Sequence, residues 1–422
     1  MDGTDFLILL FNNEGIYIAL LLFNLVLLYM FLRKRISSVI DPMMIIFILG
    51  AFANTVIPFL YVLHYVSLDL LITFYLSEFL YWTGFICVRQ NNEEKRCDFK
   101  VSDMSITLYK FFLFSICIIV VEKIYSYSVV GIPLLNESRF VNRQNPIIAI
   151  LDRIVRFPQI FVIVYSYYLL SASKFFLRKS IAVISLLILI LFNILSGSKG
   201  FILSFVYCYF IYNHFYLERK IKIKVRYLIP ILISPIIVIS IYNGTSDFMS
   251  SLSFLLYRFT ANGDGYWQGF AYDVIKYINN TASWYERVFS FVLGPLGLIS
   301  PNAKIPIGTL ILNQINPATV GSLEGANSRI PLFCYVCFGN FVSPIAAFVF
   351  GVVAAKITYV HNLSFSSRIV SSIVKGAFYM CGITMITDPT LCLSSFVDLI
   401  FGILMLNAFC VFNGLKSPVK LV

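Results

Sequence analysis

Long apolar runs joined by short polar connections make up most of this chain, and they predict membrane-spanning helices. A helix rises 1.5 Å per residue, so a run of about 18 apolar residues crosses a hydrocarbon core of about 30 Å. Such runs lie near residues 16–32, 43–63, 70–88, 106–121, 146–170, 181–195, 201–216, 227–242, 332–355, 371–387 and 391–412. The pattern therefore predicts an all-α polytopic membrane protein with about 11 transmembrane helices.

Residues 243–329 form the one long stretch that a bilayer could not hold. This stretch mixes five basic residues with five acidic ones, together with aromatic residues, glycines and prolines. We therefore expect three parts. Residues 1–242 hold helices one to eight with a basic outer loop at 122–146, residues 243–330 form a long outer loop, and residues 331–422 hold helices nine to eleven.

Two helices are expected inside the long loop. Apolar residues recur at helical spacing through 266–278, which predicts an amphipathic helix lying on the membrane surface. Asn262 or Asp264 is expected to cap it. A second helix is expected to begin at Ser283, because Ser283 and Glu286 have the spacing of a capping box.

The distribution of charge predicts the orientation. The formal net charge is +11, with 59% hydrophobic and 13% charged residues. The cations cluster in short connections such as 33–35 and 218–226, which is typical of cytoplasmic loops and not of a basic nucleic-acid-binding face. We therefore expect a multi-pass protein with its N-terminus outside and its C-terminus in the cytoplasm, and the lipid bilayer but no nucleic acid as a partner.

Cysteines give little sign of special chemistry. None of the nine lies in the long loop, so no disulfide is predicted there. Cys334 and Cys337 form a CxxC motif inside an apolar run, where ordinary packing is the simpler interpretation. No metal-binding pattern is visible, and no cofactor is expected.

Several cations are expected to meet on the outer face. We predict that six of them bind a diphosphate: Arg139, Arg143, Arg156, Lys199, Arg258 and Arg329. Guanidinium groups suit a diphosphate because they bind it in a bidentate way and stay charged. Lys199 lies between glycines, where backbone amides can approach an anion. The simpler alternatives are headgroup contacts for the arginines and a tight turn with a lysine that reaches the interface.

Transfer to a hydroxyl group requires a base, and four of the five carboxylates in the long loop are candidates: Asp264, Asp273, Glu286 and Glu324. Asp264 and Glu324 are the preferred catalytic candidates, since Glu286 is expected to serve its cap and Asp273 to face water. Carboxylates within membrane spans are costly and are commonly functional. Glu78 and Asp398 lie in such spans, and burial with hydrogen-bond partners is the alternative for each.

Short motifs across nearly the whole chain resemble the Wzy-type O-antigen polymerases. They are Gly131-Ile132-Pro133 followed by Arg139, then Gly197-Ser198-Lys199-Gly200, then Arg258 leading into Gly-Asp-Gly-Tyr-Trp at 263–267, and finally Asn-Ser-Arg-Ile-Pro at 327–331. The family commonly has arginine where this chain has Lys199, and a lysine keeps the charge but lacks the planar fork.

The resemblance implies lipopolysaccharide biosynthesis in the bacterial inner membrane. Members of this family join oligosaccharide repeat units carried on undecaprenyl diphosphate at the periplasmic face. The implied partners are an undecaprenyl-diphosphate-linked donor and acceptor, with a chain-length regulator protein as a further partner. The activity would be that of a membrane glycosyltransferase, whose cations neutralise the departing diphosphate while Asp264 or Glu324 takes the proton.

Two other functions remain open at this point. An O-antigen ligase would carry out the same chemistry with the lipid A core as acceptor. A flippase for lipid-linked oligosaccharides would be a transporter with no enzymatic step. The long loop argues against the flippase, because a flippase needs no outer loop of this size.

Overall fold

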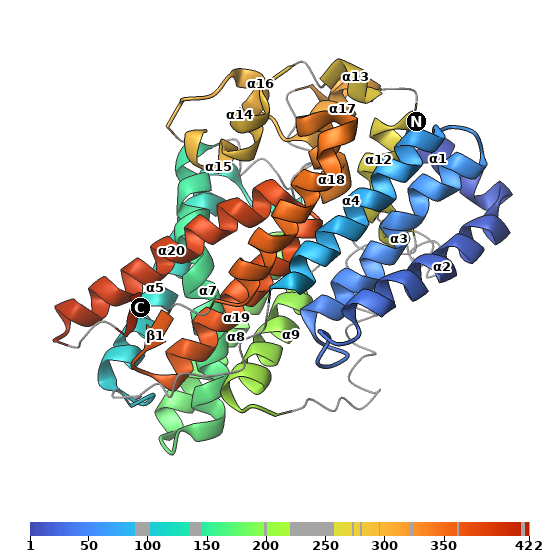
Figure 1. Cartoon of the computed structure of the whole chain (residues 1–422). Helices are drawn as coiled ribbons and strands as arrows, with labels where there is room; N and C mark the ends of the chain where they lie inside the picture. The colour runs from blue at the N-terminus through green and yellow to red at the C-terminus, as the bar shows by residue number, and fades with distance from the viewer. Residues whose placement is uncertain are drawn as a thin grey trace.

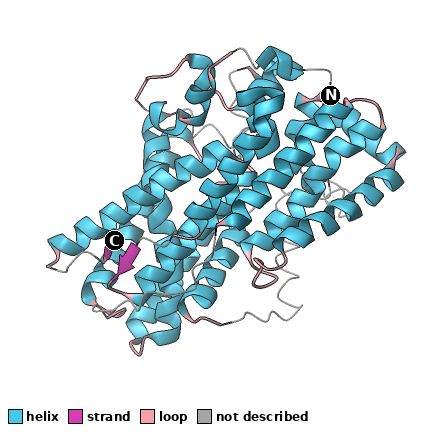
Figure 2. Ribbon diagram, in the orientation of Figure 1, coloured by secondary structure: helices cyan, strands magenta, loops and turns pink. Residues whose placement is uncertain are grey.

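The fold is seen in a computed structural model. It describes residues 1–88, 102–135, 145–197, 201–219, 257–271, 274–278, 281–294, 296–320, 325–360, 363–414 and 418–421. These residues form a bundle of helices with one small antiparallel pair of strands, β1 (Leu363–Phe365) and β2 (Val419–Leu421), as Figures 1 and 2 show. The two strands tie the start of one late helix to the last described residues.

Eight helices in the described part of the chain are long and apolar enough to cross a membrane. They are α2 (Glu14–Leu32), α3 (Pro42–Val62), α4 (Leu68–Cys87), α5 (Ile106–Val130, continued by the short helix η1 at Pro133–Leu135), α8 (Phe176–Leu195), α18 (Ile330–Thr358), α19 (Arg368–Ile383, continued by η7 at Thr384–Ile386) and α20 (Pro389–Phe412). The prediction of an all-α polytopic membrane protein is confirmed at this level.

Three predicted spans are not among these eight helices, and they account for the difference from the eleven spans that the sequence predicts. α7 (Pro146–Ala172) is long but carries Asp152, Arg153 and Arg156, and it is not among the eight. α9 (Phe201–Ile211) is short and continues as a π-helix, η2 (Tyr212–Tyr216). The span expected at 227–242 lies outside the described residues.

Short helices occupy the described part of residues 243–330 and lie together at one end of the bundle, at the top of Figure 1. They are η4 (Ala261–Gly263), α12 (Asp264–Gly269), α13 (Val274–Ile278), α14 (Trp284–Val288), α15 (Ser290–Leu293), α16 (Pro301–Lys304), α17 (Ile307–Ile315) and η6 (Pro317–Thr319). A short helix α1 (Gly3–Asn12) lies at the same end of the bundle.

The first predicted loop helix lies in its predicted stretch, but its continuity, its cap and its place on a membrane surface are predicted wrongly. It is divided into α12 and α13, and Gly263 is the N-cap of α12. Trp267 is 0% exposed and stacks on Phe6 of α1 with 4.1 Å between ring centroids. The aromatic residues therefore pack into the protein instead of lying on a membrane surface.

The second loop helix begins where the sequence predicted it. α14 follows Ser283, and the capping box of Ser283 and Glu286 is present. The Glu286 carboxylate accepts hydrogen bonds from the Ser283 backbone N–H at 3.1 Å and from the Ser283 hydroxyl at 2.5 Å. The capping prediction is therefore confirmed.

Among the described helices, α4 and α18 share the most extensive contact. A methyl group added at Gly84 would lie 2.3 Å from the carbonyl oxygen of Phe348, and one at Gly351 would lie 2.1 Å from that of Tyr81. The two backbones can approach this closely only because neither glycine has a side chain. α18 itself is broken at Gly339, whose φ of 73° and ψ of −177° are not helical.

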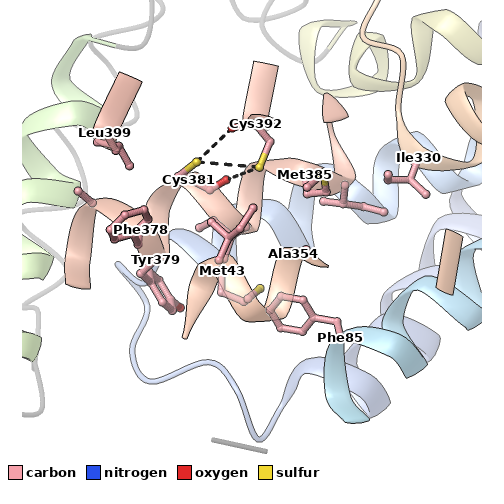
Figure 3. Packing of buried hydrophobic residues seen from close by; sticks show 14 of the residues in the cluster. Met43, Phe85, Ile330, Ala354, Phe378, Tyr379, Cys381, Met385, Cys392 and Leu399 are labelled. Carbon is pink, nitrogen blue, oxygen red and sulfur yellow. Dashed lines mark hydrogen bonds between the residues drawn. The ribbon is translucent and has the colours of Figure 1, made fainter. Parts of the chain in front are cut away.

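The turn between α19 and α20 is closed by two buried cysteines (Figure 3). Their sulfur atoms, on Cys381 and Cys392, are 4.0 Å apart. The Cys381 thiol donates to the Cys392 carbonyl at 3.3 Å, and the Cys392 thiol donates to the Cys381 carbonyl at 3.1 Å. These contacts hold the first turn of α20 against the last turn of α19.

Candidate functional site

A polar pocket with a volume of about 390 Å³ lies between α5, α7, α8 and α20. Charged and polar side chains line most of it, and apolar side chains complete the wall. The lining residues are Ile119, Lys123, Ala149, Asp152, Arg153, Arg156, Gln159, Leu189, Phe192, Asn193, Ser196 and Leu391.

Local sequence places the start of α7 beside this pocket. The Asn145 side chain accepts hydrogen bonds from the backbone N–H groups of Ile147 and Ile148, and Pro146 occupies the first turn, where its missing N–H costs nothing. Arg153 and Arg156 follow three residues apart, so both project from the same face of the helix. The helix start therefore presents two guanidinium groups together.

Asp398 of α20 binds both of these arginines. One carboxylate oxygen is 2.7 Å from Arg153 Nε, and the other is 2.9 Å from Arg156 Nη1, which also donates to the Ser395 hydroxyl at 2.6 Å. The Asp398 side chain is 2% exposed, while the arginine side chains are 32% and 36% exposed. The carboxylate is thus buried, and each guanidinium keeps an accessible part. Of the two interpretations of Asp398, the paired buried group is the one that the structure supports.

Lys123 of α5 contributes the third cation. Its ammonium group lies 3.0 Å from Glu122 and 3.1 Å from Asp152. Among the described residues, the three cations of the pocket are therefore balanced by three carboxylates. The hydrogen bonds that Arg156 makes to Ser395 and Asp398 both come from Nη1, and a guanidinium group has five N–H donors. An anion in the pocket would find donors already oriented by a carboxylate.

Two connections leave the walls of the pocket close to one another. The backbone of Gly197, just after α8, lies against Leu134 in η1, since a methyl group added at Gly197 would be 3.7 Å from the Leu134 Cα. Along the sequence, these connections continue to Arg139, Arg143 and Lys199. Those three predicted ligands lie outside the described residues, so their roles stay predictions.

Asp264 is the predicted base that the structure describes. It begins α12, and its Oδ1 accepts from the Gly265 N–H at 2.8 Å and from the Asn327 N–H at 3.3 Å. Burial raises the pKa of Asp264 to about 7, against the opposing effect of these two backbone donors and of the positive charge of Arg258. A carboxyl group of this kind can exchange a proton near neutral pH.

Arg329 is enclosed between α3, α4 and α12. It is 1% exposed and precedes α18. None of its three guanidinium nitrogens has a hydrogen bond of normal geometry with the described residues. Its neighbours include Tyr266 and the backbone of Gly50.

Glu78, the other carboxylate within a span, is also buried. Its Oε1 accepts from the Asn54 side chain at 2.8 Å and from the Trp82 indole at 2.9 Å. Asn54 belongs to α3, while Glu78 and Trp82 belong to α4. This geometry favours the interpretation of Glu78 as a hydrogen-bonded group that ties two helices together.

The predicted site residues thus fall into two groups. Arg156 lies in the pocket between α7 and α20, whereas Arg258, Asp264 and Arg329 lie near α12. Glu324 and Asp273 lie outside the described residues. Lys123 was missed, and the only signal for it was its place beside Glu122 at the end of an apolar run.

No group of three or more histidine, cysteine, aspartate or glutamate side chains in the described ranges could hold a metal ion. Comparisons with models of known protein families, with curated proteins and with solved structures gave no match.

Proposed function

We propose that this protein polymerises oligosaccharide repeat units carried on undecaprenyl diphosphate, at the periplasmic face of a bacterial inner membrane. The single observation that carries the proposal is the polar pocket, in which Arg153 and Arg156 are held side by side at the end of a membrane bundle. A lipid-linked diphosphate places its negative charge at this depth, next to apolar helices. Paired guanidinium groups are the protein side chains best suited to bind it.

In the proposed reaction, the donor glycan leaves its diphosphate and joins an acceptor sugar. An acceptor hydroxyl gives its proton to a carboxylate, its oxygen forms a bond to the anomeric carbon, and the bond between that carbon and the diphosphate breaks. Arg153, Arg156 and Lys123 would stabilise the charge that develops on the leaving diphosphate. Asp264 would accept the proton, because its raised pKa makes it a stronger base than an ordinary aspartate.

The short helices of the long loop support this division of roles. α12, which carries Asp264, contacts α3, and α15 contacts α20, which forms part of the pocket wall. One segment therefore extends over both groups of candidate residues. Because the anomeric carbon is bonded directly to the diphosphate, Asp264 can act as the base only when the part of this segment that carries it lies within reach of a diphosphate in the pocket.

The proposal is tested first at Arg156. We expect Arg156→Ala to lower the initial polymerisation rate by about 100-fold to 1,000-fold, because it removes a donor to the developing charge. Arg156→Lys should fall between Arg156→Ala and the unchanged protein, since it keeps the charge without the fork. The measurement is the elongation of lipid-linked repeat units by the purified protein in lipid.

Arg368→Ala serves as the matched control. Arg368 is also a partly exposed, ion-paired arginine, 2.7 Å from Glu218, but it lies at the start of α19, whose far end turns into α20. It should leave the rate within about twofold, in line with the small contribution of exposed ion pairs. An Arg156→Ala variant that folds and still elongates at the unchanged rate would overturn the assignment.

The lipopolysaccharide made by cells that lack the protein distinguishes a polymerase from a ligase and from a flippase. The gene for this protein is deleted in its own host, and the lipopolysaccharide is examined. Loss of a polymerase leaves lipopolysaccharide with a single repeat unit. Loss of a ligase instead leaves polymer that is not attached to the lipid A core, and loss of a flippase leaves no repeat unit outside. Only the first pattern agrees with the proposal.

A further inference from the structure

Residues 283–298 present an apolar surface in a segment outside the membrane-spanning helices. Within α14, α15 and the turn that follows, six large apolar side chains are exposed: Trp284, Tyr285, Phe289, Val292, Leu296 and Leu298. We name these six side chains the loop apolar face. Monomeric proteins rarely expose so many neighbouring apolar side chains to water, and such surfaces mark contacts with membranes or with other proteins.

Both charged side chains of this segment are hydrogen-bonded to the protein, and one of them is buried. Residues 283–298 contain only two charged residues, Glu286 and Arg287. The Glu286 carboxylate accepts from the backbone N–H groups of Ser283 and Ser300. The buried Arg287 donates to the Ile278 carbonyl at 3.2 Å and to the Thr281 hydroxyl at 2.6 Å. The exposed large side chains of this segment are therefore apolar, although its sequence also contains Glu286 and Arg287.

The loop apolar face continues an exposed apolar side of the helix bundle. The Trp284 ring lies 5.6 Å from that of Phe338 in α18, measured between centroids. Directly after this residue, α18 presents an exposed apolar row: Phe341, which is 92% exposed, then Val342, Ile345 and Val349. α18 is one of the helices that can cross a membrane. On the other side, α15 contacts α20, another such helix.

We propose that α14 and α15 insert the loop apolar face into the membrane interface, in the leaflet at this end of the bundle. Phospholipid is the partner that fits, for two reasons. The face is continuous with side chains of α18 that only acyl chains would cover in a bilayer. Its two members on α14, which contacts α18, are a tryptophan and a tyrosine, the two residues enriched at the boundary between headgroups and acyl chains.

This inference does not depend on the proposed function. It corrects the prediction for residues 266–278, since the surface-lying element is α14 with α15 and the buried element is α12. An interfacial anchor here would hold the two ends of the long loop at a fixed depth. The helices that carry Asp264 and the pocket wall would then share one reference plane, the membrane surface.

Tryptophan fluorescence provides the test, because the chain has three tryptophans and only one is exposed. Trp82 and Trp267 are buried, whereas Trp284 is 50% exposed. The full-length protein is placed in vesicles of phosphatidylcholine or of dibrominated phosphatidylcholine, whose bromine atoms quench nearby tryptophans. We expect the bromolipid to reduce the emission, and we expect Trp284→Phe to lose at least half of this quenching.

A second variant keeps the test independent of one substitution. Adding Phe289→Trp to Trp284→Phe moves the reporter one turn along the loop apolar face and should restore the quenching by bromolipid. Aqueous iodide is the opposing probe, and it should quench Trp284 less than twofold. Two results would overturn the proposal. Strong iodide quenching without bromolipid quenching places Trp284 in water, and protection from both quenchers places it under another protein or a second copy.

Discussion

At the residue scale, Asp398 determines how two arginine side chains are oriented. From the sequence, this carboxylate in an apolar run had no identifiable partner, because Arg153 and Arg156 lie far away along the chain. In the fold, α7 and α20 cross and bring all three side chains together. Buried charges of this kind are tolerated when they are paired. The arginines could be nominated from their position at a predicted outer helix end, but their orientation could not.

Removal of this carboxylate should destabilise the protein. We expect Asp398→Asn to lower the free energy of unfolding by about 2–3 kcal/mol, less than for a fully buried pair, because the arginines are partly exposed. Thermal unfolding of the purified protein measures the loss. The triple variant with Arg153→Met, Arg156→Met and Asp398→Leu should regain stability without regaining activity. If Asp398→Asn unfolds like the unchanged protein, the pairing has no role in stability.

The pH dependence should report Asp264. Its usual pKa of 3.8 is raised to about 7 by burial, so below pH 7 it is protonated and cannot act as a base. We expect the polymerisation rate to rise with pH up to about 7 and then to level off, and Asp264→Asn to remove both the activity and this ionisation. Initial rates between pH 5 and 9 would show it. A variant with the original pH profile would exclude Asp264 as the base.

The same shift affects stability with a definite sign. The folded protein keeps a proton on Asp264 that the unfolded chain releases once the pH exceeds about 4. The stabilisation is therefore complete below pH 4 and is lost as the pH rises to about 7. In Asp264→Asn this contribution to the pH dependence should be absent.

At the scale of elements, the periodicity of apolar residues predicted where helices lie along the chain better than it predicted what each helix packs against. The capping box at Ser283 gave the start of α14 because the signal is local. The helical spacing near Trp267 was equally clear, but the same apolar face can cover a membrane or a protein. The contact with Phe6 decided between them, and no local pattern contains that contact. Membrane spans were predictable from length and hydropathy, whereas the break of α18 at Gly339 was not.

The close contact between α4 and α18 predicts that alanine at either contact glycine destabilises the protein. We expect Gly84→Ala and Gly351→Ala each to destabilise by about 1–3 kcal/mol, because the added methyl group would meet a backbone oxygen at 2.3 Å or 2.1 Å. Gly15→Ala in α2 is the matched control. No atom lies within 4 Å of its added methyl group, so it should be neutral or slightly stabilising. Melting temperatures in detergent would rank the three, and equal values would contradict the close approach.

At the scale of the whole molecule, α18 and α19 join the N-terminal helices to the later ones. α18 packs on α4 and on α19, while α19 contacts α3, α7 and α20. The three-part order of spans, loop and spans, and the side of each connection inferred from charge clusters, stay predictions. The sequence did not predict the packing of α18, since a pairing between distant helices depends on the complementary shapes of both surfaces.

The contact between Phe6 and Trp267 also constrains the timing of biogenesis. The ribosome releases α1 long before it makes α12, with more than half of the chain still to be synthesised in between. Until then the aromatic ring of α1 has no tryptophan to stack on. The region around Asp264 can therefore assemble only late in translation. A chain that is truncated before α12 would leave α1 without this partner and available to quality-control proteases.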